Sequence, residues 1–98
     1  MVETRIPKVT AIVLRESPDG TEMLVFDHPT EDEGVIMQFP AGTVEPGEKP
    51  EDAVVRELME ETGIEGRIVG LAGILDQEWK GVLWHRWIYL VELIGTVK

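Results

Sequence analysis

The sequence predicts one small α/β domain, and three observations support that prediction. The chain has 98 residues, which is the size of a single domain. Several runs are rich in β-branched and aromatic residues, as expected of strands, and one internal run has the composition of a helix. The hydrophobic fraction of 43% is ample for a packed core. Residues 1–98 are therefore expected to form one folded unit.

Three strands are predicted before the helix. Val9–Leu14 and Met23–Phe26 are expected to form a hairpin, because Ser17–Gly20 between them has the composition of a turn. His28–Gly34 is polar and is expected to be a loop in which Glu31, Asp32 and Glu33 are solvated, with a substrate-facing role as the alternative. Val35–Phe39 is the third predicted strand.

Two further strands are predicted after the helix. Arg67–Leu75 is interrupted by two glycines, so this strand is expected to be bulged or bent. Asp76–Gly81 is polar and is predicted to be a loop that carries Trp79. Val82–Leu93 is the longest β-prone run, and both of its faces are largely apolar, as in a strand covered on both sides.

The helix is predicted to begin at Pro50 and to stop at Gly63. Lys49 occupies the N-cap position, where Ser, Thr or Asp would stabilise the helix start better. Glu51 and Asp52 lie in the first turn and partly compensate, because carboxylates interact favourably with the positive end of the helix dipole.

Three glutamates of this helix, Glu57, Glu60 and Glu61, are spaced i, i+3, i+4 and therefore share one face. Three hard oxygen donors this close together suit Mg²⁺ or Mn²⁺. The alternative is an ordinary solvated face, on which Arg56 would form weak i, i+4 ion pairs with Asp52 and Glu60.

The run Gly42–Ile64 resembles the Nudix box of the Nudix hydrolases (MutT-like) and matches its spacing throughout. The matching residues are Gly42, Glu48, Arg56, Glu57, Leu58, Glu60, Glu61, Gly63 and Ile64. The resemblance implies an α/β/α sandwich around a mixed sheet. The family's usual C-terminal helix is lacking here, since the chain stops at Lys98 soon after its last strand. Either the chain is a piece of a longer protein, or a second subunit covers the apolar sheet, so a homodimer is expected.

The resemblance also implies roles for the residues of the box. Glu57, Glu60 and Glu61 would hold the metal and act in catalysis, together with the backbone carbonyl of Ala41 as a further metal ligand. Gly42 would let the backbone approach the site closely. Glu48 and Arg56 would pair with each other and brace the loop against the helix, so they would orient the metal-binding carboxylates without touching the metal.

Outside the box, four residues are of interest. Glu92 resembles the strand-end glutamate that lies near the metals in family members, although it could equally be a solvated residue. Arg86 could contact a substrate phosphate, but a structural pair with Glu92 is favoured because both lie on one face of the strand. Trp79 is the preferred candidate for stacking on a nucleobase, and the alternative is that its ring only packs against other side chains. His85 is expected to be a packed or exposed histidine and not a base.

The activity that the resemblance implies is Mg²⁺- or Mn²⁺-dependent hydrolysis of a nucleoside diphosphate linked to another moiety X, by attack of water at phosphorus. The general base could be Glu60, Glu61 or Glu92. Two alternatives are a Nudix-fold module that senses a nucleotide without turnover, and a structural domain with an acidic face. The substrate stays open, although Phe39–Gly42 leans towards nucleotide sugars.

The composition is acidic and free of cysteine. The net charge of −10 repels nucleic-acid backbones, so bulk nucleic-acid binding is not expected. A phosphate substrate would then need local positive charge, which bound cations could supply. The absence of cysteine excludes disulfides and thiolate metal sites. No signal peptide or membrane-spanning run is recognisable, so a cytoplasmic protein without a membrane partner is expected.

Overall fold

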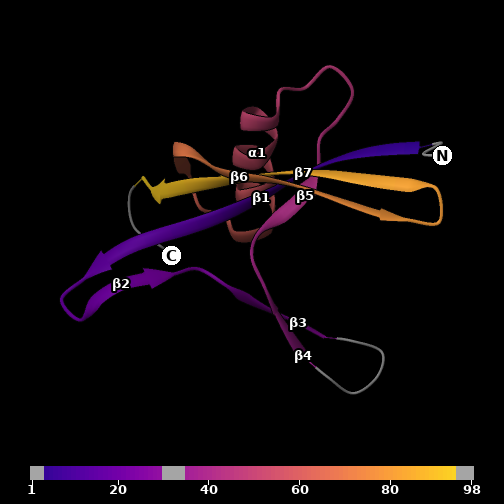
Figure 1. Ribbon diagram of the computed structural model, residues 1–98. Coiled ribbons are helices and arrows are strands. Elements are labelled where there is room, and N and C mark those ends of the chain that lie inside the picture. The colour runs from indigo at the N-terminus through magenta and orange to yellow at the C-terminus, as the bar shows by residue number, and fades with distance from the viewer. Residues whose placement is uncertain (1–3, 30–34, 95–98) are drawn as a thin grey trace.

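A computed structural model describes residues 4–29 and 35–94 (Figure 1). Its elements, in chain order, are β1 (Thr4–Ser17), β2 (Gly20–Met23), β3 (Phe26–Pro29), β4 (Val35–Gln38), β5 (Ala41–Thr43), α1 (Pro50–Thr62), β6 (Gly66–Trp79) and β7 (Val82–Leu93). The main sheet has the strand order β2-β1-β7-β6, and β5 also pairs with β1. The sheet is mixed, because β1 and β7 are parallel while the other pairs are antiparallel.

The core lies between α1 and one face of this sheet. Val9, Ala11 and Val13 of β1 alternate along the strand and are buried, and Val54 and Leu58 of α1 are buried against them. The register places Trp87, Tyr89 and Val91 of β7 beside those β1 residues, so they share this face. Figure 1 shows the helix over the middle of the sheet, on one side only.

The other face of the sheet carries the intervening residues of β1 and β7. Ile12, Leu14, Ile88 and Leu90 are only half-buried there, and no helix of the described chain covers them. The hairpin of β3 and β4 projects away from the main sheet and pairs only with itself (Figure 1).

The helix begins and ends as the sequence predicts. Pro50 is its first residue, and Lys49 makes no capping bond with its side chain. Gly63 takes the left-handed conformation, with φ of 73°, and its N–H donates to the carbonyl of Met59 at 2.9 Å. No helix in residues 4–29 and 35–94 is long and apolar enough to cross a membrane.

The strand predictions before the helix are partly confirmed. The β1–β2 hairpin turns where Ser17–Gly20 predicts it. The predicted strand Met23–Phe26 is wrong as a single element: Leu24 packs against the core and, with Val25, links β2 to β3. The predicted loop His28–Gly34 begins too early, because His28 pairs with β4, and its acidic part at 30–34 lies outside the described residues.

After the helix, the predicted bulges are confirmed by register shifts at Ile68/Gly70 and Leu71/Gly73. The predicted loop 76–81 is wrong, because β6 continues to Trp79 against β7. Only Lys80 and Gly81 form the turn, both with positive φ (49° and 79°), as tight two-residue hairpins require. The backbone pairing with β7 outweighs the polar composition of this segment.

Gly66 provides a test of the packing between α1 and β7. A Cβ at this position would lie 2.5 Å from Val91 Cγ1 and 2.7 Å from Leu58 Cδ2, and both side chains are buried. We expect Gly66→Ala to lower the free energy of unfolding by about 1–3 kcal/mol through overpacking. The control Gly70→Ala meets nothing within 4 Å and should stay within about 0.5 kcal/mol of the parent. Urea denaturation measures both, and equal stability of the two variants would contradict this packing.

Candidate functional site

Arg56 is the centre of a polar cluster between α1 and the segment that follows β5. Its Nε and Nη2 donate to the two carboxylate oxygens of Glu48, at 2.8 and 2.9 Å. Its Nη1 donates to Glu57 Oε1 at 2.8 Å and to Glu60 Oε2 at 3.2 Å. Its Nη2 also donates to the carbonyl oxygen of Thr43 at 3.1 Å. One guanidinium therefore ties the loop, the helix and β5 together.

The Glu48–Arg56 pair is strongly electrostatic. Hydrogen bonds from Arg56, with a smaller contribution from the backbone N–H of Glu45, lower the pKa of Glu48 from its ordinary value of 4.5 to about 2. The same pairing raises the pKa of Arg56 above its ordinary value. The side chains of Arg56 and Glu48 are only 24% and 17% exposed, so solvent screens this pair less than a surface ion pair.

Glu61 has a different partner. Its Oε2 accepts a hydrogen bond from the backbone N–H of Ala41 at 3.1 Å, at the edge of β5 that faces away from β1. Burial raises the pKa of Glu61 above its ordinary value, and the charges of Glu57 and Glu60 raise it further, although the Ala41 bond opposes the shift. The surroundings of Glu61 thus favour its protonated form more than those of an exposed carboxyl group do.

Gly42 is required by the position of Glu57. A Cβ on Gly42 would lie 2.0 Å from Cδ and 2.4 Å from Oε2 of Glu57. The carboxylate of Glu57 therefore rests directly on the backbone of β5, in space that any other residue would fill. The predicted role of Gly42, close approach of the backbone to the site, agrees with this geometry.

The three predicted metal ligands do not converge on one point. Glu57 and Glu60 both contact Nη1 of Arg56, whereas Glu61 turns to Ala41. Within residues 4–29 and 35–94, no three acidic or histidine side chains are arranged to hold a metal ion.

The chemistry of the cluster nevertheless suits a hard divalent cation. The side-chain atoms of the cluster that could bind a cation are all carboxylate oxygens. Three glutamates bond to Arg56, and Glu45 lies 3.8 Å from it in addition. A single guanidinium faces four carboxylates, so a large negative charge is left uncompensated.

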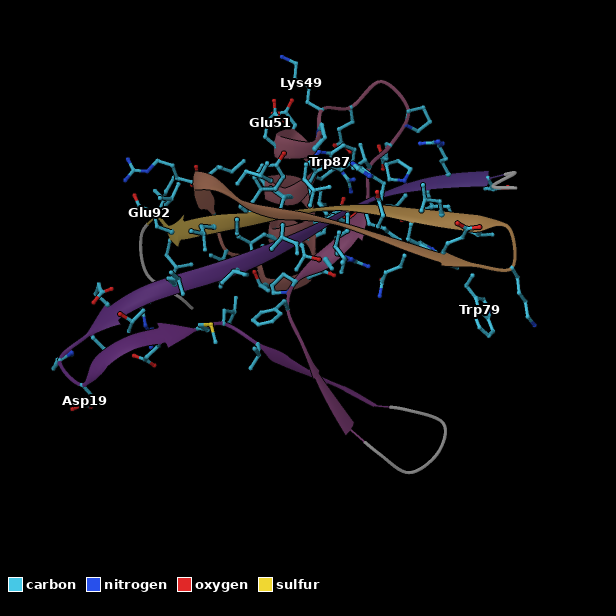
Figure 2. The ribbon with its side chains drawn as sticks, viewed as in Figure 1. Asp19, Lys49, Glu51, Trp79, Trp87 and Glu92 are labelled. Carbon is cyan, nitrogen blue, oxygen red and sulfur yellow. The ribbon has the colours of Figure 1, made fainter. Side chains whose placement is uncertain are left out.

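The candidate site residues that were predicted outside the Nudix box have their partners outside the Arg56 cluster. Glu92 forms an ion pair with Arg67, its direct neighbour on β6, and Arg86 donates to Thr10 Oγ1 at 2.7 Å. The predicted pair of Arg86 with Glu92 is therefore wrong, because each finds a partner on the adjacent strand. Both lie on the sheet face opposite α1, because Trp87, Tyr89 and Val91, which alternate with them along β7, pack in the core under the helix. Trp79 is 66% exposed beside the β6–β7 turn, and Figure 2 shows it and Glu92 at opposite ends of the sheet.

Two arrangements were not predicted from the sequence. His85 Nδ1 lies 2.5 Å from Asp76 Oδ1, and its ring packs edge-on against Trp87 at a centroid distance of 4.4 Å. Lys8 lies beside Arg86 on the sheet, and its Nζ donates to Thr43 Oγ1 at 2.7 Å. The alternation of polar and apolar residues along β1 could have indicated the face that Lys8 occupies, but not its neighbour on β7.

The chain is thus an α/β domain in which a mixed sheet packs under one acidic helix, with the glycine-bearing strand β5 against that helix. The family model for the NUDIX domain matches residues 4–97, so the chain belongs to the NUDIX family. Its fold is the α/β Nudix fold, as the sequence predicts.

Individual relatives agree with this assignment. A Caenorhabditis elegans protein carrying the name nudix hydrolase 1 is 38% identical over 85 residues, which are 87% of this chain and 22% of that protein. The 8-oxo-dGTP diphosphatase of Escherichia coli is 45% identical over 56 residues, covering 57% of this chain and 43% of that enzyme. The solution structure of the Escherichia coli ORF135 protein superposes with a TM-score of 0.82 and 30% identity, over 97% of this chain and 66% of that one. The chain thus spans less than two thirds of each.

The Glu48–Arg56 pair predicts how stability depends on pH. A carboxyl group whose pKa falls from 4.5 to about 2 on folding stabilises the fold fully above pH 4.5, and this contribution is lost as the pH falls towards 2. The melting temperature of the parent should therefore exceed that of Glu48→Gln at pH 6, and the difference should shrink between pH 4.5 and 2. Circular dichroism melts at several pH values measure this. A difference that is constant over the range would contradict the role of the pair.

Proposed function

We propose that this chain is a divalent-metal-dependent hydrolase that cleaves the pyrophosphate bond of a nucleoside diphosphate linked to a moiety X, by attack of water at phosphorus. The carboxylate cluster around Arg56 carries the proposal. It gathers more negative charge than its one guanidinium can balance, which favours binding of a cation. Membership of the NUDIX family and the diphosphatase relative support the same activity.

In this proposal Glu57, Glu60 and Glu61 hold Mg²⁺ or Mn²⁺, with the carbonyl of Ala41 as a further ligand. When bound, the metal would neutralise charge on the diphosphate and acidify a water molecule. Glu57 is already fixed against Gly42, while Glu60 is largely exposed, with 58% of its side chain accessible. The free-energy cost of moving the Glu60 carboxylate from Arg56 to a bound cation is therefore small.

Arg56 and Glu48 position the cluster and do not react. The doubly hydrogen-bonded pair fixes the guanidinium, and the guanidinium in turn orients Glu57 and Glu60. Glu60 and Glu61 are the preferred candidates for the general base, because both lie in the carboxylate cluster on α1. Glu92 is the weaker candidate, since it is paired with Arg67 on the other face of the sheet.

The substrate is proposed to be a small nucleotide, in keeping with the name of the diphosphatase relative. Trp79 and Arg86 stay candidates for substrate contacts, because Trp79 is exposed and the charge of Arg86 is bonded only to a hydroxyl among the described residues. The homodimer and the cytoplasmic location stay predictions.

The substitution Glu60→Gln tests the proposed activity. It keeps the size of the side chain and removes one metal-binding charge, so Mg²⁺-dependent turnover of a nucleotide panel should fall about a hundredfold or more. The control Glu65→Gln removes the same charge just beyond the helix, outside the Arg56 cluster, and should retain activity. Phosphate or nucleotide release measures both variants. Undiminished turnover by Glu60→Gln would refute the assignment, and binding without turnover by the parent would favour the sensor alternative.

A further inference from the structure

Two cations lie side by side on the sheet face opposite α1. Lys8 of β1 and Arg86 of β7 are direct neighbours in the parallel ladder. Lys8 donates through Nζ to Thr43 Oγ1, and Arg86 donates through Nη1 to Thr10 Oγ1, each at 2.7 Å. Lys8, Thr10 and Arg86 are half-buried. Both positive charges are thus held in place by neutral hydroxyl groups on neighbouring strands.

This pairing differs from that of other cations in the chain. Arg15, Arg56 and Arg67 each form an ion pair with a carboxylate. Among the ion pairs of the described residues, none involves Lys8 or Arg86. Arg5, Lys49 and Lys80 of the described residues form no ion pair either, but Lys8 and Arg86 are neighbours in the ladder and each bonds to a hydroxyl. Their charge stays available for an external anion, and a planar guanidinium beside an ammonium suits a phosphate group.

β5 connects these cations to the carboxylate cluster. Thr43 bonds to both groups, because its carbonyl accepts from Arg56 and its hydroxyl accepts from Lys8. Ala41, whose N–H holds Glu61, is two residues away, about 7 Å along a strand. In the described chain β5 pairs with no strand other than β1, and its other edge bonds to side chains of the cluster: the Ala41 N–H to Glu61 and the Thr43 carbonyl to Arg56. A short chain of phosphates at this edge could therefore reach the carboxylates and Lys8 together.

We propose that Lys8 and Arg86 bind a phosphate group of the substrate, so that the preferred X is itself a phosphate, as in a nucleoside triphosphate. This inference rests on the proposed function for its substrate. A neutral sugar in place of X would leave both cations without a partner. The chain should therefore discriminate between substrates by the charge of X.

The first experiment measures steady-state kinetics with ATP and with ADP-glucose in Mg²⁺. In the double variant Lys8→Gln/Arg86→Gln, KM for ATP should rise about tenfold or more, because charged hydrogen bonds to phosphate are lost. Its KM for ADP-glucose should rise by a much smaller factor, because this substrate lacks the phosphate that the two cations are proposed to bind. The control Arg15→Gln/Lys49→Gln removes the same charge from two exposed positions outside both sites and should match the parent. An unchanged KM for ATP, or an equal rise for both substrates, would overturn the proposal.

The second experiment is independent of turnover. Calorimetric titration of inorganic tripolyphosphate in EDTA should show binding to the parent and to Lys8→Arg/Arg86→Lys, and binding about tenfold weaker to the Gln double variant. Equal affinity of parent and Gln variant, or no binding to the parent, would overturn the anion site. Binding that depends on Lys8 and Arg86 in a chain without hydrolytic activity would uphold the site and refute the proposed function. Circular dichroism melts confirm that each variant is folded.

Discussion

The doubly hydrogen-bonded pair of Arg56 with Glu48 is the interaction on which the rest of the site depends. Glu48 lies in the loop before α1 and Arg56 lies on the helix, so the pair fixes one against the other. With both planar groups locked, the remaining donors of Arg56 point at Glu57, Glu60 and the carbonyl of Thr43. The orientation of two proposed metal ligands thus follows from a contact that need not touch the metal.

β5 is only three residues long, yet each residue serves a different part of the site. Ala41 donates its N–H to Glu61, Gly42 makes room for the carboxylate of Glu57, and Thr43 bonds to both Arg56 and Lys8. The carboxylates, with Arg56 among them, therefore lie on the helix side of this strand, and Lys8 lies on the opposite side with Arg86 beside it. Such a separation of charge across one strand suits a ligand that needs a bridging cation at one end and direct contacts with cations at the other.

The sequence predicted the box well, because its geometry is local. Pro50, Gly63 and the i, i+3, i+4 spacing of the glutamates determine the helix and its acidic face within a few turns. The Glu48–Arg56 pairing came from the family resemblance, and the structure contains it. The three glutamates do not converge on one point, as a shared metal ion would require. Glu57 bonds to Arg56 and Glu61 bonds to the Ala41 N–H, and the helical spacing alone does not reveal these partners.

Features that depend on strand register were beyond the sequence. The partner of Glu92 is Arg67, and Lys8 is adjacent to Arg86, because β7 pairs with β6 on one side and β1 on the other. No local pattern contains that information. The polar composition of residues 76–79 suggested a loop, because their pairing with β7 depends on strand register and cannot be read from the local sequence.

Calorimetric titration of Mn²⁺ is the most direct test of the central claim, which is that the carboxylates around Arg56 and β5 form a divalent-cation site. The account predicts saturable binding by the parent and binding about tenfold weaker by Gly42→Ala, because the added methyl group displaces the carboxylate of Glu57. Gly70→Ala, which meets no neighbour, should bind as the parent does. Absence of saturable binding by the parent at millimolar Mn²⁺, or equal affinity of the parent and Gly42→Ala, would contradict the account.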